Sequence, residues 1–205
     1  MVRPHRHSAL SDYTTTTRFA AQSFAETIRA GLDRVHDADR DAVKHFEKLS
    51  ALEQELAKAS AEHVVSAYAK VHVARYNAEH AKTLADLHRA TLMDSVDAAA
   101  TALLNLAKQG IARVHGGLGA CPPGRAVGKT AVRDVVWQAR NQSSHCDEGN
   151  YSSKVVQVFA ELEAEFGAAC HLDPKGGENL ALMVVLILGW EKDSAYETDM
   201  ASLLR

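Results

Sequence analysis

Glycine and proline are missing from a long part of this sequence. No glycine or proline occurs between Gly31 and Gly110, and the whole chain has only four prolines. Because these two residues are the usual breakers of helices and markers of turns, so long an interval favours long helices joined by tight polar turns and leaves no room for strands. The sequence therefore predicts an all-α fold.

Cysteine pairs and long apolar runs are also lacking. The three cysteines have no paired spacing, so neither a disulfide framework nor a four-cysteine zinc site is expected. Residues 1–8 are polar and basic without the apolar core of a signal peptide, and the densest apolar run, residues 180–188, is too short to span a bilayer. We expect a cytoplasmic protein with no cofactor, no metal site and no membrane partner.

The net charge of -3 argues against a protein that coats nucleic acid along its whole surface, but the charge is unevenly placed. Residues 108–140 carry six basic side chains and one acidic one, a net +5, which leaves -8 on the rest of the chain. A local basic surface of this kind can hold a phosphate backbone on an otherwise acidic protein. The six basic residues are Lys108, Arg113, Arg125, Lys129, Arg133 and Arg140.

Apolar spacing and capping residues predict four helices before residue 110. The first is expected over residues 12–35, and the second follows residues 37–39, whose two aspartates are typical N-caps. Ser60 is expected to cap the third helix and Asp94 the fourth. The apolar stripes expected on the second and third helices are Val43, Phe46, Leu49, Leu52 and Leu56, then Val64, Tyr68 and Val71.

These patterns suggest three parts of the chain. Residues 1–10 are interpreted as a flexible terminus, residues 11–82 as a helical extension or hairpin, and residues 83–205 as a helical bundle. Between residues 36 and 82, glutamates and lysines alternate around a narrow apolar stripe, which is typical of a coiled-coil arm and would serve dimerisation. The histidines of this region show no metal-ligand spacing.

A glycine-rich segment, residues 110–128, holds six of the twelve glycines and is predicted to be a loop. Its end, residues 124–130, superficially matches a phosphate-binding P-loop, but proline stands at position 123, where that pattern needs glycine, and the preceding residues have helical rather than strand spacing. Nucleotide hydrolysis is therefore not expected. Instead, Thr130 is predicted to start a helix with Arg125 and Lys129 near its positive N-terminal end, where they would contact phosphates.

The most informative stretch is Trp137–His145. Apolar stripes lie before it (Val132, Val135, Val136, Ala139) and after it (Val155, Phe159, Leu162, Phe166), and the later helix is expected between a cap at Asn150 or Ser152 and Gly167. Asn141 and His145 are four residues apart, so a helix would place them on one face beside Arg140, with Gly149 just past the helix end. A fixed guanidinium and an imidazole that titrates near neutral pH are what phosphodiester cleavage without a metal requires.

This Arg-Asn-x-x-x-His spacing resembles the motif of the HEPN superfamily, an arginine, a polar residue, and a histidine after four to six intervening positions. Residues 107–190 also resemble a bacterial HEPN-type group through Gln-Ala-Arg-Asn-Gln, Asp-Glu-Gly and Leu-Gly-Trp. The resemblance implies an up-and-down helical bundle that dimerises so that two motifs face each other. It further implies a metal-independent endoribonuclease, a toxin or anti-phage effector, with a cognate antitoxin of nucleotidyltransferase type.

In this interpretation His145 is the general acid or base, Arg140 stabilises the phosphate, and Asn141 orients the phosphate or the imidazole. The basic residues Arg125, Lys129 and Arg133 would contact RNA.

A non-catalytic protein fits the same residues. It would be a helical interaction or nucleotide-binding module, antitoxin-like or structural, in which the arginine and histidine of the motif merely cap a helix end. For Asp147 and Glu148, membership of a solvated helix end is favoured over orientation of His145.

Overall fold

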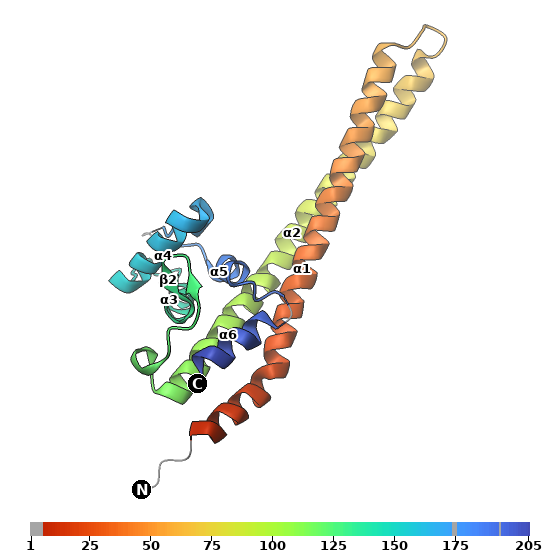
Figure 1. The fold of residues 1–205 in the computed structure, drawn as a ribbon. Helices are drawn as coiled ribbons and strands as arrows, with labels where there is room; N and C mark the ends of the chain where they lie inside the picture. Colours follow the sequence, from red (N-terminus) through yellow and green to blue (C-terminus); the bar gives the residue numbers. More distant parts are fainter. Residues whose placement is uncertain (1–5, 174–175, 193) are drawn as a thin grey trace. The chain divides into compact units, whose positions relative to one another are not determined.

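The computed structural model of the chain describes residues 6–173, 176–192 and 194–205. The predicted all-α helical bundle is confirmed, since 77% of the chain is helical (Figure 1). The helices in the described ranges are α1 (Arg6–Ala57), α2 (Val64–His115), α3 (Val132–Ser144), α4 (Ser153–Phe166), α5 (Ala181–Leu188) and α6 (Ala195–Leu203). Two short 3-10 helices, η1 (Leu118–Ala120) and η2 (Ala168–Cys170), and two strands, β1 (Ala126–Val127) and β2 (Thr130–Ala131), complete these ranges.

The chain forms two compact units. Unit 1 comprises Met1–Arg29 and Val96–Arg205, and unit 2 comprises Ala30–Ser95. Residues 11–29, predicted to belong to the extension, are part of unit 1 together with the C-terminal residues. Within unit 1, the buried Tyr13 donates a hydrogen bond to the carbonyl of Leu106. Of the expected terminus 1–10, residues 1–5 lie outside the described residues, and the backbone is helical from Arg6.

Two predicted helix boundaries are wrong, because α1 and α2 each run unbroken through them. The aspartates interpreted as caps make other contacts: Asp37 pairs with Arg40 at 3.2 Å, and Asp39 pairs across the hairpin with Arg89 at 2.6 Å. Asp94 lies inside α2. A capping residue stabilises a helix end but does not create one, and no glycine or proline is present to end the helices here.

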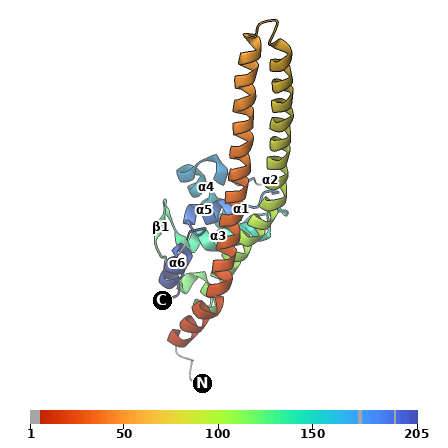
Figure 2. The same ribbon diagram turned by 90° about the vertical axis from the view of Figure 1, so that its right-hand side faces the viewer.

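In unit 2, α1 and α2 form a helical hairpin (Figure 2). The two helices pack largely through small side chains. Alanine has the highest helix propensity and allows two helix backbones to approach closely. This seam is therefore narrower than the predicted stripes. Its buried residues are Ala42, Leu49, Val71, Ala74, Ala78, Ala81 and Ala85.

The predicted stripes of unit 2 are correct only in part. Leu49 and Val71 are buried as predicted, but Val43, Phe46 and Tyr68 are exposed. Alanines occupy much of the packed face, so these three larger side chains remain in solvent. None of the helices in the described part of the chain has a stretch long and apolar enough to traverse a bilayer.

The core of unit 1 forms around α3, which packs against α4 and α5. The predicted α3 stripe is confirmed, because its four members are at most 1% exposed. The α4 boundaries are also confirmed, with Ser152 as N-cap, accepting from the amide of Val155, and Gly167 as C-cap. Phe166, the last residue of α4, is an exception, because it is 44% exposed.

The predicted loop before α3 contains a short β-hairpin. Val127 pairs with Thr130, and Gly128, with φ 57°, occupies the two-residue turn between the strands. Thr130 therefore does not cap α3, which begins at Val132 after Ala131. The segment with P-loop-like letters is thus a hairpin and not a strand-to-helix phosphate loop.

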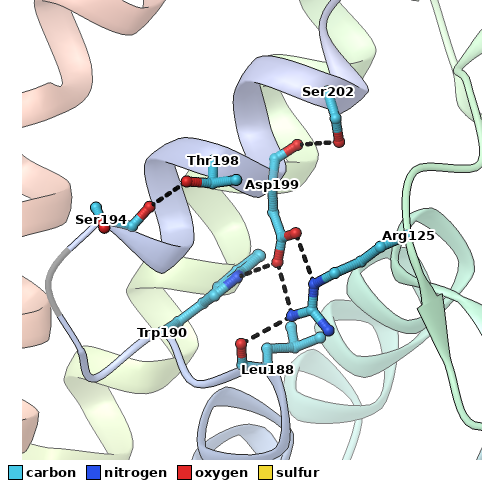
Figure 3. A network of polar contacts seen from close by, with 7 residues as sticks. All are labelled: Arg125, Leu188, Trp190, Ser194, Thr198, Asp199 and Ser202. Carbon is cyan, nitrogen blue, oxygen red and sulfur yellow. Dashed lines mark hydrogen bonds and ion pairs between the residues drawn. The ribbon is translucent and has the colours of Figure 1, made fainter.

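A buried ion pair joins this hairpin to the C-terminal helix of unit 1 (Figure 3). The Asp199 carboxylate, 3% exposed, accepts from Nε and Nη2 of Arg125 at 2.8 and 2.9 Å. It also accepts from the indole N–H of the fully buried Trp190 at 2.8 Å. Arg125 Nη2 donates in addition to the carbonyl of Leu188 at 2.8 Å. The carboxylate is thereby both neutralised and fully hydrogen-bonded.

Candidate functional site

The motif histidine lies at the C-terminal end of α3. The helix ends at Ser144, and His145 is the C-cap, with its amide donating to the carbonyl of Gln142 at 3.1 Å. Its side chain is 51% exposed. Gly149, expected just past the helix, instead follows a turn of three further residues and has φ 62°.

Glu148 orients the imidazole. Its Oε1 lies 3.0 Å from Nδ1 of His145. A carboxylate can only accept a hydrogen bond, so Nδ1 carries a proton in this contact, and Nε2 makes no hydrogen bond within the described structure. Glu148 lies at a solvated helix end, as the sequence predicts, since its side chain is 64% exposed, and it makes this contact in addition. A histidine held in one tautomer with an open Nε2 is suited to accept a proton.

Arg140 lies one and a half helical turns before His145 and points toward α2. Its Nε donates to Oδ1 of Asn105 at 3.2 Å, and the side chain is partly exposed. Neither terminal guanidinium nitrogen makes a hydrogen bond or ion pair within the described ranges. The bidentate edge of the guanidinium, which suits phosphate oxygens, is therefore open.

A second cation, Lys108 of α2, lies beside Arg140. Its Nζ is 2.6 Å from Oδ1 of Asn141 and 4.7 Å from the ring centroid of Trp137, a cation–π distance. Partial burial, and then the charge of Arg140, lower the pKa of Lys108. We refer to Lys108, Arg140, Asn105, Trp137 and Asn141 as the cationic cluster.

Asn141 belongs to the cationic cluster rather than to the histidine. Its amide accepts from Lys108 and donates to Gln138 at 3.4 Å, and no hydrogen bond joins it to His145 in the described structure. The expected shared face requires a regular helix, whereas His145 has φ -131° and ψ 20°.

The end of α3 is fixed by residues to which the sequence patterns assigned no role. The fully buried Gln142 donates to the carbonyl of Glu178 at 2.7 Å and accepts from the amide of Leu180 at 3.0 Å. The amide of Gly177 donates to the carbonyl of Cys146, in the turn after the motif, at 2.7 Å. These contacts fix the chain just before and just after His145 to residues 177–180. The sequence offered one indication of this role: Gln142 is an amide on a helix face that is otherwise largely apolar, and a buried amide needs hydrogen-bond partners.

The adjacent Gly176 allows this segment to pass close to the motif turn. Its φ of 81° is left-handed, and a Cβ there would lie 2.4 Å from the carbonyl oxygen of Cys146. Any other residue would therefore push the two segments apart.

The three residues expected to contact RNA have different surroundings. Arg125 is committed to Asp199 and Leu188, so the structure gives it an intramolecular role. Arg133 donates to the carbonyl of Cys121 at 2.7 Å and to its neighbour Asp134 at 3.2 Å. Lys129, in the turn of the β-hairpin, is exposed and has no ion pair among the described residues, so of the three it is the most available to an external anion.

Within the described ranges, the histidines, cysteines and acidic side chains form no group of three that would suit a metal ion. Three free thiols are present, with Cys121 and Cys170 buried and Cys146 partly exposed. Burial raises the pKa of Cys121 to about 11 and also raises that of Cys170. These two thiols therefore remain protonated and unreactive near neutral pH.

Comparison of the chain with protein-family models, with curated proteins and with solved structures gave no match.

Proposed function

We propose that the protein is a metal-independent endoribonuclease of the HEPN type, acting as a toxin or anti-phage effector. The observation that carries this proposal is the environment of His145. The imidazole is half exposed, its Nδ1 is hydrogen-bonded to Glu148 at 3.0 Å, and its Nε2 makes no hydrogen bond within the described structure. On the same end of α3, Arg140 offers a guanidinium edge without a carboxylate partner in the described structure. A half-exposed imidazole and an arginine without a carboxylate partner, five residues apart toward the C-terminal end of one helix, are groups that phosphodiester cleavage can use.

The proposed reaction needs no water in its first step. Nε2 of His145 removes the proton from the ribose 2′-hydroxyl, the 2′-oxygen bonds to phosphorus, and the bond from phosphorus to the 5′-oxygen breaks. The leaving 5′-oxygen takes a proton from a second acid, assigned to His145 of a partner copy. Arg140 stabilises the extra negative charge on the pentavalent phosphorus. The products are a 2′,3′-cyclic phosphate and a 5′-hydroxyl, and DNA is resistant because it lacks the 2′-hydroxyl.

Further parts of the proposal follow from the resemblance. The protein acts as a homodimer in which two motifs supply base and acid, and a cognate antitoxin of nucleotidyltransferase type restrains it. Its RNA substrate places its site of action in the cytoplasm. Asn141 acts by positioning Lys108, its 2.6 Å partner, and Lys129 contacts the RNA outside the reacting phosphate.

The test compares wild-type protein with the variant His145→Ala on RNA and on DNA of the same sequence, with EDTA present. Wild-type protein should cleave RNA alone and leave cyclic phosphate ends. The variant should be slower by about 10²- to 10⁴-fold, the usual contribution of a general acid or base. Expression of wild-type protein, but not of the variant, should slow bacterial growth.

His171 provides a matched control, because its Nδ1 also lies 3.0 Å from a glutamate, Glu163, and its side chain is 60% exposed. No arginine or lysine of the cationic cluster contacts it. His171→Ala should therefore cleave RNA at the wild-type rate. Equal rates for wild-type protein and His145→Ala would remove the nuclease proposal.

A non-catalytic interaction module is the second candidate, favoured by the apolar surface of unit 2. Val65, Tyr68 and Tyr76 of α2 are each more than 60% exposed, away from the alanine seam. Under this alternative a second copy of the chain covers these side chains, and dimerisation is the function. Replacing all three by serine or glutamine would then abolish the dimer seen by light scattering, while wild-type protein would show no RNA cleavage.

A further inference from the structure

Lys108 and Arg140 are two like charges that the fold holds close together. Each is fixed by an amide oxygen, Lys108 by Asn141 at 2.6 Å and Arg140 by Asn105 at 3.2 Å. Partial burial, and then the neighbouring positive charge of Arg140, lower the pKa of Lys108. A nearby anion would offset both effects on the ammonium.

No carboxylate supplies that anion in the described structure. The ion pairs of these residue ranges include neither Lys108 nor Arg140, whereas Arg125 and Arg133 of the same basic window both have carboxylate partners. The partners of the two cations are neutral: amide oxygens and the face of the Trp137 ring. The local charge is therefore positive and uncompensated by the protein.

Donors remain available for an external ligand. An ammonium has three N–H groups, of which Asn141 takes one and the Trp137 face can take another. The terminal nitrogens of Arg140 make no hydrogen bond in the described part of the chain. The remaining N–H of Lys108 and the guanidinium edge can thus bind neighbouring oxygens of one phosphate.

We propose that Lys108 and Arg140 form a two-cation subsite for one backbone phosphate of single-stranded RNA, with Trp137 as the aromatic platform beneath the ammonium. The choice of ligand rests on the proposed nuclease function. Lys108 is then an RNA-binding residue, contributed by a helix outside the motif, that grips the phosphate on which Arg140 acts. Nothing in the spacing of the motif itself indicates this lysine.

The test measures binding separately from cleavage. A fluorescently labelled RNA oligonucleotide with 2′-O-methyl groups cannot be cleaved through its 2′-oxygen, and fluorescence polarisation over a series of salt concentrations gives the Kd and its salt dependence. Lys108→Met removes the charge but keeps a similar side-chain volume. Its slope of log Kd against log salt should fall by about 0.7, the value for one phosphate contact to a single strand, or about a fivefold weaker Kd at 0.1 M salt.

Two control variants separate the phosphate contact from other effects. Lys108→Arg keeps the charge and should retain most of the wild-type slope. Lys154→Met removes an equal charge from the exposed surface of α4 and should bind like wild-type protein. Circular dichroism of all three variants should match that of wild-type protein, which excludes loss of the fold.

The outcomes distinguish this inference from the nuclease proposal. If Lys108→Met binds with the wild-type slope while His145-dependent cleavage persists, the subsite is wrong and the nuclease stands. If binding depends on Lys108 but wild-type protein cleaves no RNA, the subsite stands and the nuclease falls. If wild-type protein does not bind the oligonucleotide, the subsite is overturned whatever the cleavage assay gives.

Discussion

Replacing Arg125 by methionine should destabilise unit 1 without affecting the proposed RNA cleavage. The change leaves the Asp199 carboxylate, 3% exposed, with only the Trp190 N–H as donor. Removing one partner of a fully buried ion pair costs about 3–5 kcal/mol. The Arg125 side chain is 45% exposed, so water can replace part of the lost interaction, and we expect about 2–3 kcal/mol. For a chain of this size the melting temperature should fall by roughly 4–12 °C.

Urea unfolding followed by tryptophan fluorescence measures this loss, since Trp137 and Trp190 both belong to unit 1. Arg18→Met is the control: it breaks a similarly paired arginine, bound to Glu197 of the same α6 helix, but on an exposed surface. Its midpoint should hardly change. The double variant Arg125→Met with Asp199→Asn should recover part of the stability, because the unpaired buried charge is gone.

An Arg125→Met variant as stable as wild-type protein, with weaker RNA binding, would refute this reasoning. That result would mean that the guanidinium serves RNA, as the basic window first suggested, and that the ion pair with Asp199 contributes nothing to the fold.

Other parts of the structure give four further expectations. Ala78→Leu should overfill the hairpin seam of unit 2 and cost about 1–3 kcal/mol in a thermal melt. Gln142→Ala should leave the two backbone groups it bonds unpaired, lower the melting temperature, and reduce the rate of RNA cleavage because the turn carrying the histidine loses an anchor. Alkylation at pH 8, followed by mass spectrometry, should label Cys146 well before Cys121, whose pKa of about 11 leaves roughly one thiolate in a thousand. Finally, the part of RNA affinity that depends on Lys108 requires its protonated form. Because the pKa of Lys108 is lowered, this contribution to the affinity should be lost at a pH below the ordinary lysine value of 10.5. Lys108→Arg should remove this pH dependence.

Local sequence patterns predicted correctly those features of the helices that depend on nearby residues. The α3 stripe and the α4 caps are correct because burial of a repeated apolar face and a satisfied helix terminus depend on nearby residues. The breaks expected before Asp39 and at Asp94 failed because an aspartate has several uses. Asp39 forms an ion pair with Arg89, fifty residues away, and only the pairing of the two helices reveals this.

In the candidate site, too, features set by nearby residues could be predicted, whereas features set by contacts between distant residues could not. Arg140 and His145 could be selected because they are close in sequence and chemically matched to phosphate chemistry. Lys108 could be counted as part of a basic window but not given a role, because its contact with Asn141 depends on how α2 crosses α3. Glu148 and Asp147 are equivalent in sequence, and only the geometry of the turn selects Glu148 as the partner of the imidazole.

The basic window itself serves two purposes that net charge cannot separate. Arg125 meets a buried carboxylate, so its charge is neutralised inside the protein and stabilises the packing of α6. Among the described residues, Arg140 and Lys108 contact only neutral amides and an aromatic ring, so no carboxylate neutralises their charge. Burial and the charge of Arg140 lower the pKa of Lys108, so the fold holds this ammonium at a cost. A ligand with negative charge would offset that cost, and for this reason the proposed RNA phosphate is assigned to the cationic cluster rather than to the whole window.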